Sequence, residues 1–163
     1  MNRLGAPGHL ARRFLQSVRG GWPTPDDQTW VATLLDADES ELFWSQSAID
    51  ACHGIAVARY VGETLPARPD LLRAALFHDI GKTVNPIGPI RRSIATVLAA
   101  LGLPLSRRMA TYRQHAERGA EILSDHGHTG ITVDFARHHK SAEPPAGVEP
   151  SVWDVLRRAD HLA

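Results

Sequence analysis

The chain has few of the features that mark disulfide-rich, secreted or membrane-spanning proteins. Cys52 is the one cysteine among 163 residues, so no disulfide can form within the chain, which suits a reducing compartment. The longest apolar run, SIATVLAALGLPL, is too short to cross a bilayer and contains a glycine and a proline. The N-terminal stretch MNRLGAPGHLARRF has no apolar core long enough for a signal peptide. From these absences we expect a soluble, cytoplasmic protein without a membrane partner.

The chain also has no net charge and very few lysines. The 18 basic residues balance 18 acidic ones, so no global field favours nucleic acid, and we expect no specific nucleic-acid binding. Two of those 18 basic residues are lysines, Lys82 and Lys140, which leaves 16 arginines. Each lysine follows a histidine motif, HDIGK or RHHK. A bias toward arginine, with two lysines left at random positions, explains this pattern equally well.

The residues that are present favour one all-α domain. Hydrophobic residues make up 43% of the chain and charged residues 22%, which is typical of a globular protein. No segment shows sustained apolar and polar alternation, so we expect no sheet. We predict a single helical bundle over residues 1–163, with an N-terminal helical extension at 1–37 and the core at 38–163. The Pro-rich SAEPPAGVEP reads as a loop inside this domain.

Helix boundaries follow from capping residues. Asp38 with Glu41 forms a capping-box pattern that predicts a helix from 38 to about 60. Pro69 suits a first helical position, and Gly81 suits a left-handed C-terminal residue, so a second helix is expected over 69–81. Further helices are predicted over 89–102, 105–125, 131–139 and 151–162, and two shorter ones before residue 38.

Several of these predicted helices aim ionisable groups toward the core. On helical phase, the inward groups are four histidines and two aspartates: His53, His78, His115, His138, Asp134 and Asp160. One inward histidine is usually an ordinary hydrogen-bonded core residue. A whole set is harder to explain, because buried charges must be paired or bound to metal. If these groups converge, they form a nitrogen- and oxygen-rich site for ions such as Mn, Fe, Co or Zn.

The order of these residues resembles a known superfamily. His53, then His78-Asp79, then Asp160 resembles the H…HD…D signature of the HD-domain superfamily of metal-dependent phosphohydrolases. His115 in RQHAERGAEIL and the histidine pair in RHHK extend the resemblance to the two-metal pattern H…HD…H…H…D. That branch includes the HD-GYP phosphodiesterases and the mixed-valent di-iron oxygenases. The resemblance implies an all-helical fold and two divalent transition-metal ions, with Fe or Mn favoured.

The resemblance also implies a role for each matched residue. His53, His78 and Asp160 would hold one metal, His115 and His138 the other, and Asp79 would bridge the two. His139 is the alternative to His138, which we prefer on helical phase. Lys82 would reach a phosphate oxygen, so Asp79 and Lys82 are the candidate catalytic residues. The segment HHKSAEPP lacks the Gly-Tyr-Pro tripeptide of HD-GYP proteins, which argues against a cyclic dinucleotide. Ile49 stands where some relatives carry a glutamate for a third metal, and Asp50 is out of phase, so we expect two metals.

The implied activity is hydrolysis of a phosphate ester, mono- or diester, by a water activated between two metals. The expected partner is a small phosphorylated substrate, most readily a nucleotide or related metabolite. Six arginines between residues 91 and 118 (91, 92, 107, 108, 113 and 118) with one acid, Glu117, could supply one or two phosphate contacts. A di-iron oxygenase of a small alcohol or phosphonate, and a non-catalytic binding domain, stay open as alternatives. The oligomeric state stays open as well.

Overall fold

The described part of the protein is helical throughout. The structure, a computed structural model, describes residues 21–84 and 114–163. Its elements are α2 (Pro25–Ala32), α3 (Ala37–Trp44), α4 (Ala48–Thr64), α5 (Pro69–Phe77), the 3₁₀ helix η1 (Ile80–Val84), α8 (His115–Asp125), α9 (Ile131–His138) and α10 (Pro150–Leu162). These two ranges contain no strand, which confirms the predicted all-α class. The predicted helix 89–102, the start of 105–125 and one short N-terminal helix lie outside the described residues.

The single helix predicted over 38–60 is in fact two helices. α3 ends at Trp44, and α4 begins at Ala48 after the N-cap Ser47, whose hydroxyl accepts from the Asp50 amide at 3.3 Å. The capping box of α3 is made by Asp36 and Glu39 rather than by Asp38 and Glu41. The sequence DADESE contains two acid-x-x-Glu patterns two residues apart, and the structure uses the earlier one.

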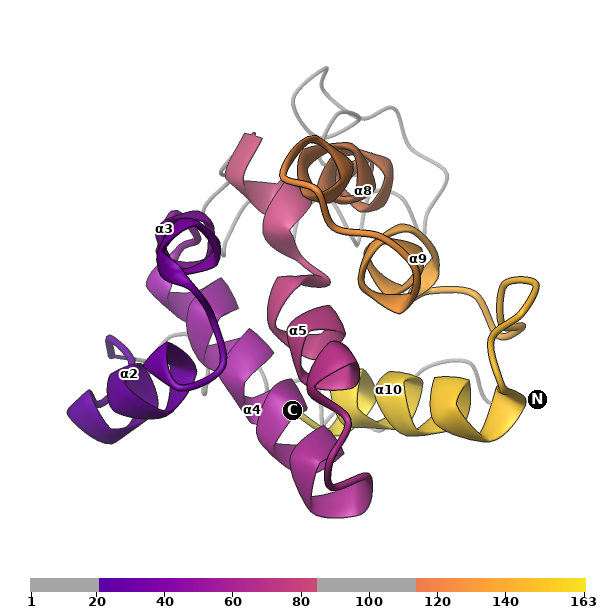
Figure 1. Ribbon diagram of the computed structural model, residues 1–163, viewed down its shortest axis with the longest axis horizontal. Helices are drawn as coiled ribbons and strands as arrows, with labels where there is room; N and C mark the ends of the chain where they lie inside the picture. Colours follow the sequence, from indigo (N-terminus) through magenta and orange to yellow (C-terminus); the bar gives the residue numbers. More distant parts are fainter. Residues whose placement is uncertain (1–20, 85–113) are drawn as a thin grey trace, which may run out of the picture.

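Helix α5 lies at the centre of the bundle (Figure 1). It packs against α4, α9 and α10, while α2 and α3 lie on the outer side of α4. The α5 side chains are fully buried at Leu71, Ala74, Ala75, Leu76 and Phe77. Burying a side chain as large as Leu or Phe stabilises the fold by roughly 1.5–3 kcal/mol. The centre of the apolar core is therefore the helix that leads directly into the HDIGK segment.

Two glycines bring backbones unusually close together beside this segment. A Cβ on Gly54 of α4 would lie 2.8 Å from the Leu76 carbonyl oxygen of α5. A Cβ on Gly81 would lie 1.9 Å from the His115 carbonyl oxygen and 2.5 Å from the Gly119 nitrogen. Only a glycine permits such approaches between main chains. The second contact holds η1 against the first turn of α8.

The predicted reason for Gly81 was therefore wrong. α5 ends at Phe77, with His78 as its C-cap in ordinary right-handed geometry, and the chain continues into η1. The glycines with positive φ in the described ranges are Gly127, Gly130 and Gly147. Gly81 is needed for space and not for a left-handed turn.

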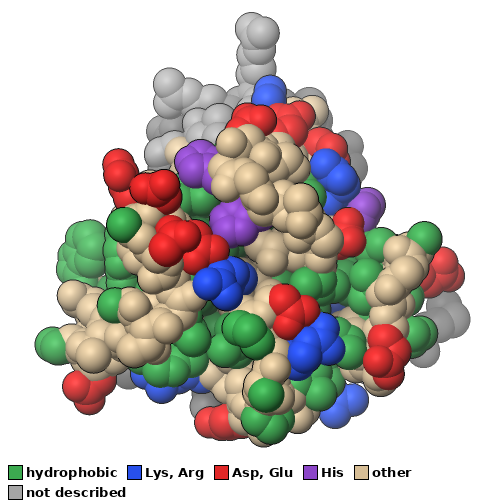
Figure 2. Space-filling view, viewed as in Figure 1, with side chains coloured by type: hydrophobic (Ala, Val, Ile, Leu, Met, Phe, Trp, Pro, Cys, Tyr) green, Lys and Arg blue, Asp and Glu red, His purple; other side chains and the backbone are tan. Residues whose placement is uncertain are grey.

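Helices α8 and α9 pack side by side, and α10 crosses α4 (Figure 1). The predicted helices 131–139 and 151–162 are confirmed to within one residue, and the Pro-rich 141–149 is a loop. Across the residues described, no helix is both long and apolar enough to cross a membrane. Figure 2 shows acidic, basic and apolar side chains interspersed over one face of the molecule.

Candidate metal centre

His78 is held in one orientation by the end of α5. As the C-cap residue it brings its Nδ1 to 2.7 Å from the carbonyl oxygen of Ala75, one of the last acceptors of the helix. An Nδ1–H that donates to this carbonyl leaves the lone pair on Nε2. That Nε2 is buried and has no hydrogen-bond partner. A buried, oriented and unsatisfied imidazole nitrogen is what a metal ligand presents.

His139 repeats this arrangement at the end of α9. It is the C-cap residue, its side chain is buried, and its Nδ1 lies 3.0 Å from the carbonyl oxygen of Ala136. The two histidines therefore share one local arrangement. Each is the C-cap residue of its helix, and the carbonyl three residues earlier fixes the orientation of its ring. Their ring centroids are 5.4 Å apart. Two separate helices thus direct Nε2 atoms toward the same region.

A first group of candidate ligands joins α4, the end of α5 and α10. It consists of His53, His78 and Asp160, whose ligand atoms all lie within 4.8 Å of one another. His53 Nε2 is 2.9 Å from Asp160 Oδ1, and His78 Nε2 is 3.3 Å from the same oxygen. His53 and Asp160 are 107 positions apart in the chain, so it is the packing of the helices that brings them together.

A second group lies beside the first and is made by Asp79, His115 and His139, again within 4.8 Å. All three residues are buried. Asp79 faces both groups, because its Oδ2 is 3.4 Å from His78 Nε2 and its Oδ1 is 3.5 Å from His115 Nε2. Such a carboxylate has the position of a bridge between two ions. Next to this group, the main chain of Gly81 lies close to that of His115.

His138, the preferred residue of the RHHK pair, does not join either group. Its side chain is exposed, whereas His139 is 3% exposed. The buried positions of α9 are Thr132, Val133, Phe135 and Ala136, so the inner face runs 132, 135, 136, 139. The predicted face ran through Ile131 and Asp134, which are half-buried. The predicted phase was therefore wrong by one residue.

Electrostatics inside the two groups show strong mutual stabilisation. Burial alone would raise the pKa of Asp79, but Lys82 and the surrounding histidines outweigh it and hold that pKa far below the usual range. Burial would likewise raise the pKa of Asp160, and its hydrogen bond to His53 and its contact with His78 lower it instead. Both carboxylates are therefore charged and available as ligands.

The pKa values of the histidines shift in different directions. Burial lowers the pKa of His139 to about 4, and the neighbouring His78 acts in the same direction. Burial also lowers the pKa of His53. For His78 the nearby carboxylates of Asp79 and Asp160 outweigh burial and raise the pKa. His78 Nε2 thus lies between two carboxylates that favour a positive charge at this point.

Both lysines of the chain lie at this centre. Lys82 donates a short hydrogen bond to Asp79 Oδ2, and its Nζ is 3.5 Å from Asp50 Oδ1. Asp50 is 4% exposed and also accepts from the Ser47 hydroxyl at 2.6 Å. Lys140 Nζ lies 3.2 Å from His115 Nε2. The sequence reasoning set Asp50 aside on helical spacing and gave Lys140 no role, and the structure brings both to the centre.

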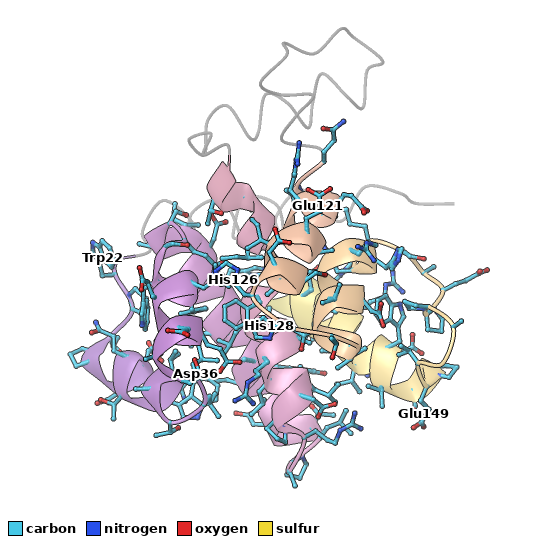
Figure 3. The ribbon with its side chains drawn as sticks, turned by 45° about the horizontal axis from the view of Figure 1, so that its top comes forward. Trp22, Asp36, Glu121, His126, His128 and Glu149 are labelled. Atoms are coloured by element: carbon cyan, nitrogen blue, oxygen red, sulfur yellow. The ribbon has the colours of Figure 1, made fainter. Side chains whose placement is uncertain are left out.

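Other candidates lie elsewhere. Arg118 is half exposed and pairs with Glu121 on its own helix. The other five arginines of the predicted cluster, at 91, 92, 107, 108 and 113, lie outside the described residues. His126 and His128 belong to the end of α8 and the loop after it (Figure 3), and His128 approaches Glu39 of α3 at 3.9 Å. Neither joins the two candidate groups.

The comparison with protein families agrees with this geometry. The model of the HD domain matches residues 51–163, about two thirds of the chain. The chain therefore belongs to the HD domain family, whose members bind divalent metal ions and are commonly metal-dependent phosphohydrolases. Neither a curated protein nor a solved structure matches the chain. The predicted division into an extension and a core stays a prediction.

The residues fit the metal that this family implies. The unsatisfied Nε2 of His78 faces two carboxylates, and three further imidazoles line up beside it. Successive ring centroids from His53 to His78, His139 and His115 are 5.2, 5.4 and 5.7 Å apart. Imidazole and carboxylate are the ligand types that Fe, Mn, Co and Zn accept in proteins.

Proposed function

We propose that this protein is a phosphohydrolase that holds two divalent transition-metal ions, with Fe or Mn favoured. In this proposal His53, His78 and Asp160 hold one ion, His115 and His139 hold the other, and Asp79 bridges them. The substrate is a phosphate ester, most readily a nucleotide or a related small phosphorylated metabolite. The observation that carries the proposal is the position of Asp79 between the two groups, with a lysine bonded to it.

When bound, two divalent ions supply an activated water and polarise the phosphoryl oxygens of a substrate. The side chains around them have separate tasks. The carbonyls of Ala75 and Ala136 fix two imidazole rings, so that their Nε2 atoms need no reorientation. The apolar core behind α5 and α9 keeps bulk water away from the inner side of the groups.

Lys82 favours phosphate chemistry over oxygenation. Its ammonium is held between Asp79 and Asp50, and its side chain is 15% exposed. A fixed ammonium beside the bridging carboxylate stabilises negative charge that develops on a phosphoryl group. Asp50 then acts as a positioning residue, because it holds the lysine from the side of α4. Oxygenation of an uncharged alcohol would gain no comparable stabilisation from this cation.

The test is a substrate panel run with Mn and separately with Fe. It contains nucleoside mono-, di- and triphosphates, cyclic nucleotides and an aryl phosphate. We expect metal-dependent release of phosphate or nucleoside, reduced by about 100-fold or more in Lys82→Ala. Lys82→Arg retains the charge, and Arg118→Ala removes an exposed cation as a control. Metal content is measured in every variant, so that loss of activity is separated from loss of metal.

Oxygen consumption with a polyol or a phosphonate, together with silence across the phosphate panel, would replace this proposal with the oxygenase. Silence in both assays, with metal bound, would favour a binding domain without catalysis.

A further inference from the structure

Lys140 is placed at the centre by the same helix end that presents His139. It follows His139 directly, and its backbone lies at the exposed end of α9. Its ammonium nevertheless reaches inward and lies 3.2 Å from Nε2 of His115, a residue that is 4% exposed. The contact joins α9 to the first residue of α8, across 25 positions of sequence. An exposed stem thus carries a charge to a buried imidazole.

The chemistry of that contact depends on the state of His115. An ammonium has only protons to offer, so the hydrogen bond requires a lone pair on His115 Nε2. The same lone pair is the one that a metal ion would use. A divalent ion on Nε2 therefore takes that lone pair, breaks this hydrogen bond and places two like charges close together. An anion held between them would convert this repulsion into attraction.

Lys82 supplies a second ammonium at the same group. The two lysines approach from different sides, since Lys82 lies on Asp79 and Lys140 lies on His115, and these two residues are 3.5 Å apart. Two ammonium groups are suited to a ligand with several acceptor oxygens. A terminal phosphate has three strong acceptor oxygens and a charge near −2. A phosphodiester has one oxygen fewer and a single charge.

We propose that Lys140, acting with Lys82, forms an anion subsite over the Asp79, His115 and His139 group that selects phosphomonoesters over phosphodiesters. This inference rests on the proposed function and narrows its substrate class. The proposal makes Lys140 a specificity-determining residue that touches the substrate phosphate. The chemical class that it favours is a small molecule with a terminal phosphate, such as a nucleoside monophosphate.

The competing explanation is that Lys140 is only a counter-charge that stabilises the second group. The two explanations differ in what the lysine contacts when metal is bound. A counter-charge affects metal content or folding and is indifferent to phosphate. A subsite residue affects phosphate binding and leaves metal content unchanged.

The experiment uses the whole chain loaded with Mn and inorganic phosphate as the probe. Isothermal titration calorimetry measures the phosphate Kd for the wild type, Lys140→Gln and Lys140→Arg, with Mn content measured on the same samples. Loss of one charged hydrogen bond should weaken phosphate binding about tenfold in Lys140→Gln. Lys140→Arg should retain most of the affinity, and His138→Gln, an exposed neighbour, should match the wild type. An unchanged phosphate Kd, no phosphate binding by the wild type, or a fall in Mn content in Lys140→Gln would each overturn the proposal.

A second measurement compares an aryl phosphomonoester with a bis-aryl phosphodiester. Lys140→Gln should lower kcat/KM for the monoester about tenfold and change the diester much less. Equal changes for both esters would overturn the selectivity. If the wild type hydrolyses neither ester but phosphate binding still depends on Lys140, the anion subsite stands and the hydrolase assignment fails. If the wild type hydrolyses an ester but phosphate binding does not depend on Lys140, the hydrolase assignment stands and the anion subsite fails.

Discussion

The two candidate ligand groups differ in exposure and in their neighbours. The group of His53, His78 and Asp160 is partly exposed, at 17% and 19% for the first and last side chains, and its aspartate contacts both of its histidines. The group of Asp79, His115 and His139 is buried throughout, and lysines from outside contact two of its three members. Two ammonium groups thus border the second group.

This difference favours one group as the side on which an anionic substrate binds. The two ammonium groups beside the second group attract negative charge, so an anionic substrate is expected to bind on this side. Asp79 belongs to the second group and also faces the first, so a change at Asp79 should affect both groups.

The largest effect is expected from Asp79→Ala. Since the carboxylate faces both groups, its removal should cost both metal ions and all activity. Asp160→Ala should empty mainly the first group, leaving about one ion per chain. Elemental analysis of protein purified without chelator and then reconstituted with Mn or Fe measures both outcomes. Unchanged metal content in Asp79→Ala, or no metal in the wild type, would contradict the two-group arrangement.

The adjacent histidines of RHHK provide the next test. His139→Ala should lose the ion of the second group, because its buried ring faces Asp79 and His115. His138→Ala should keep the metal content and activity of the wild type, since its side chain is exposed. The two variants remove the same side-chain atoms at adjacent positions, so each is a control for the other. The opposite result would restore the phase predicted from sequence.

Chelation should reveal how much the bound ions contribute to stability. A ligand present at about 100 times its Kd stabilises the folded state by about 2.7 kcal/mol. For a chain of this length that corresponds to a fall of about 5–10 °C in Tm on metal removal. Calorimetry with and without chelator measures the fall, and added Mn should reverse it. In Asp79→Ala the chelator should have no effect, and a Tm that still falls would show that ions bind elsewhere.

Gly81→Ala should disturb the second group while leaving the first in place. The added methyl would meet the backbone of His115 and Gly119, and such overpacking costs about 1–3 kcal/mol. Gly127→Ala is the control, because Gly127 has a φ of +81° and open space around it. The control should lose about 1 kcal/mol through backbone strain alone. Chemical denaturation gives both values, and equal metal content in both variants would mean that Gly81 does not set the Asp79 to His115 spacing.

Much of the centre could be predicted from the sequence because its parts are far apart in the chain. His53, the pair His78-Asp79, His115 and Asp160 are well separated along the chain, so their order was sufficient to match the pattern. The RHHK pair was different. Adjacent positions of a helix differ by about 100° in direction, and a helix of 8 residues has too few apolar positions to fix which of two neighbours faces inward.

The contacts of Asp50, Gly81 and Lys140 could not have been predicted in the same way. Spacing along α4 correctly excludes Asp50 from the ligand face, yet a lysine from η1 reaches it. Gly81 appears in sequence as a helix end, and its function is a main-chain contact with another helix. The Asp50 contact arises from the packing of η1 against α4, and the Gly81 contact from the packing of η1 against α8. No local pattern encodes either one. For His139 one local signal was available. Like His78, it follows a helix end and has an alanine three residues before it, whose carbonyl fixes the ring.

The scarcity of lysine has a practical consequence for handling the protein. Since Lys82 and Lys140 are the only lysine side chains of this chain, any reagent directed at amino groups acts on the centre before any other side chain. Reductive methylation, amine-coupled immobilisation and fluorescent succinimidyl labels would all modify the two ammonium groups that contact Asp79 and His115. The exposed Lys140 should react ahead of the half-buried Lys82. Conjugation through the single thiol of Cys52, which contacts the Gly21 carbonyl rather than either group, avoids both amines.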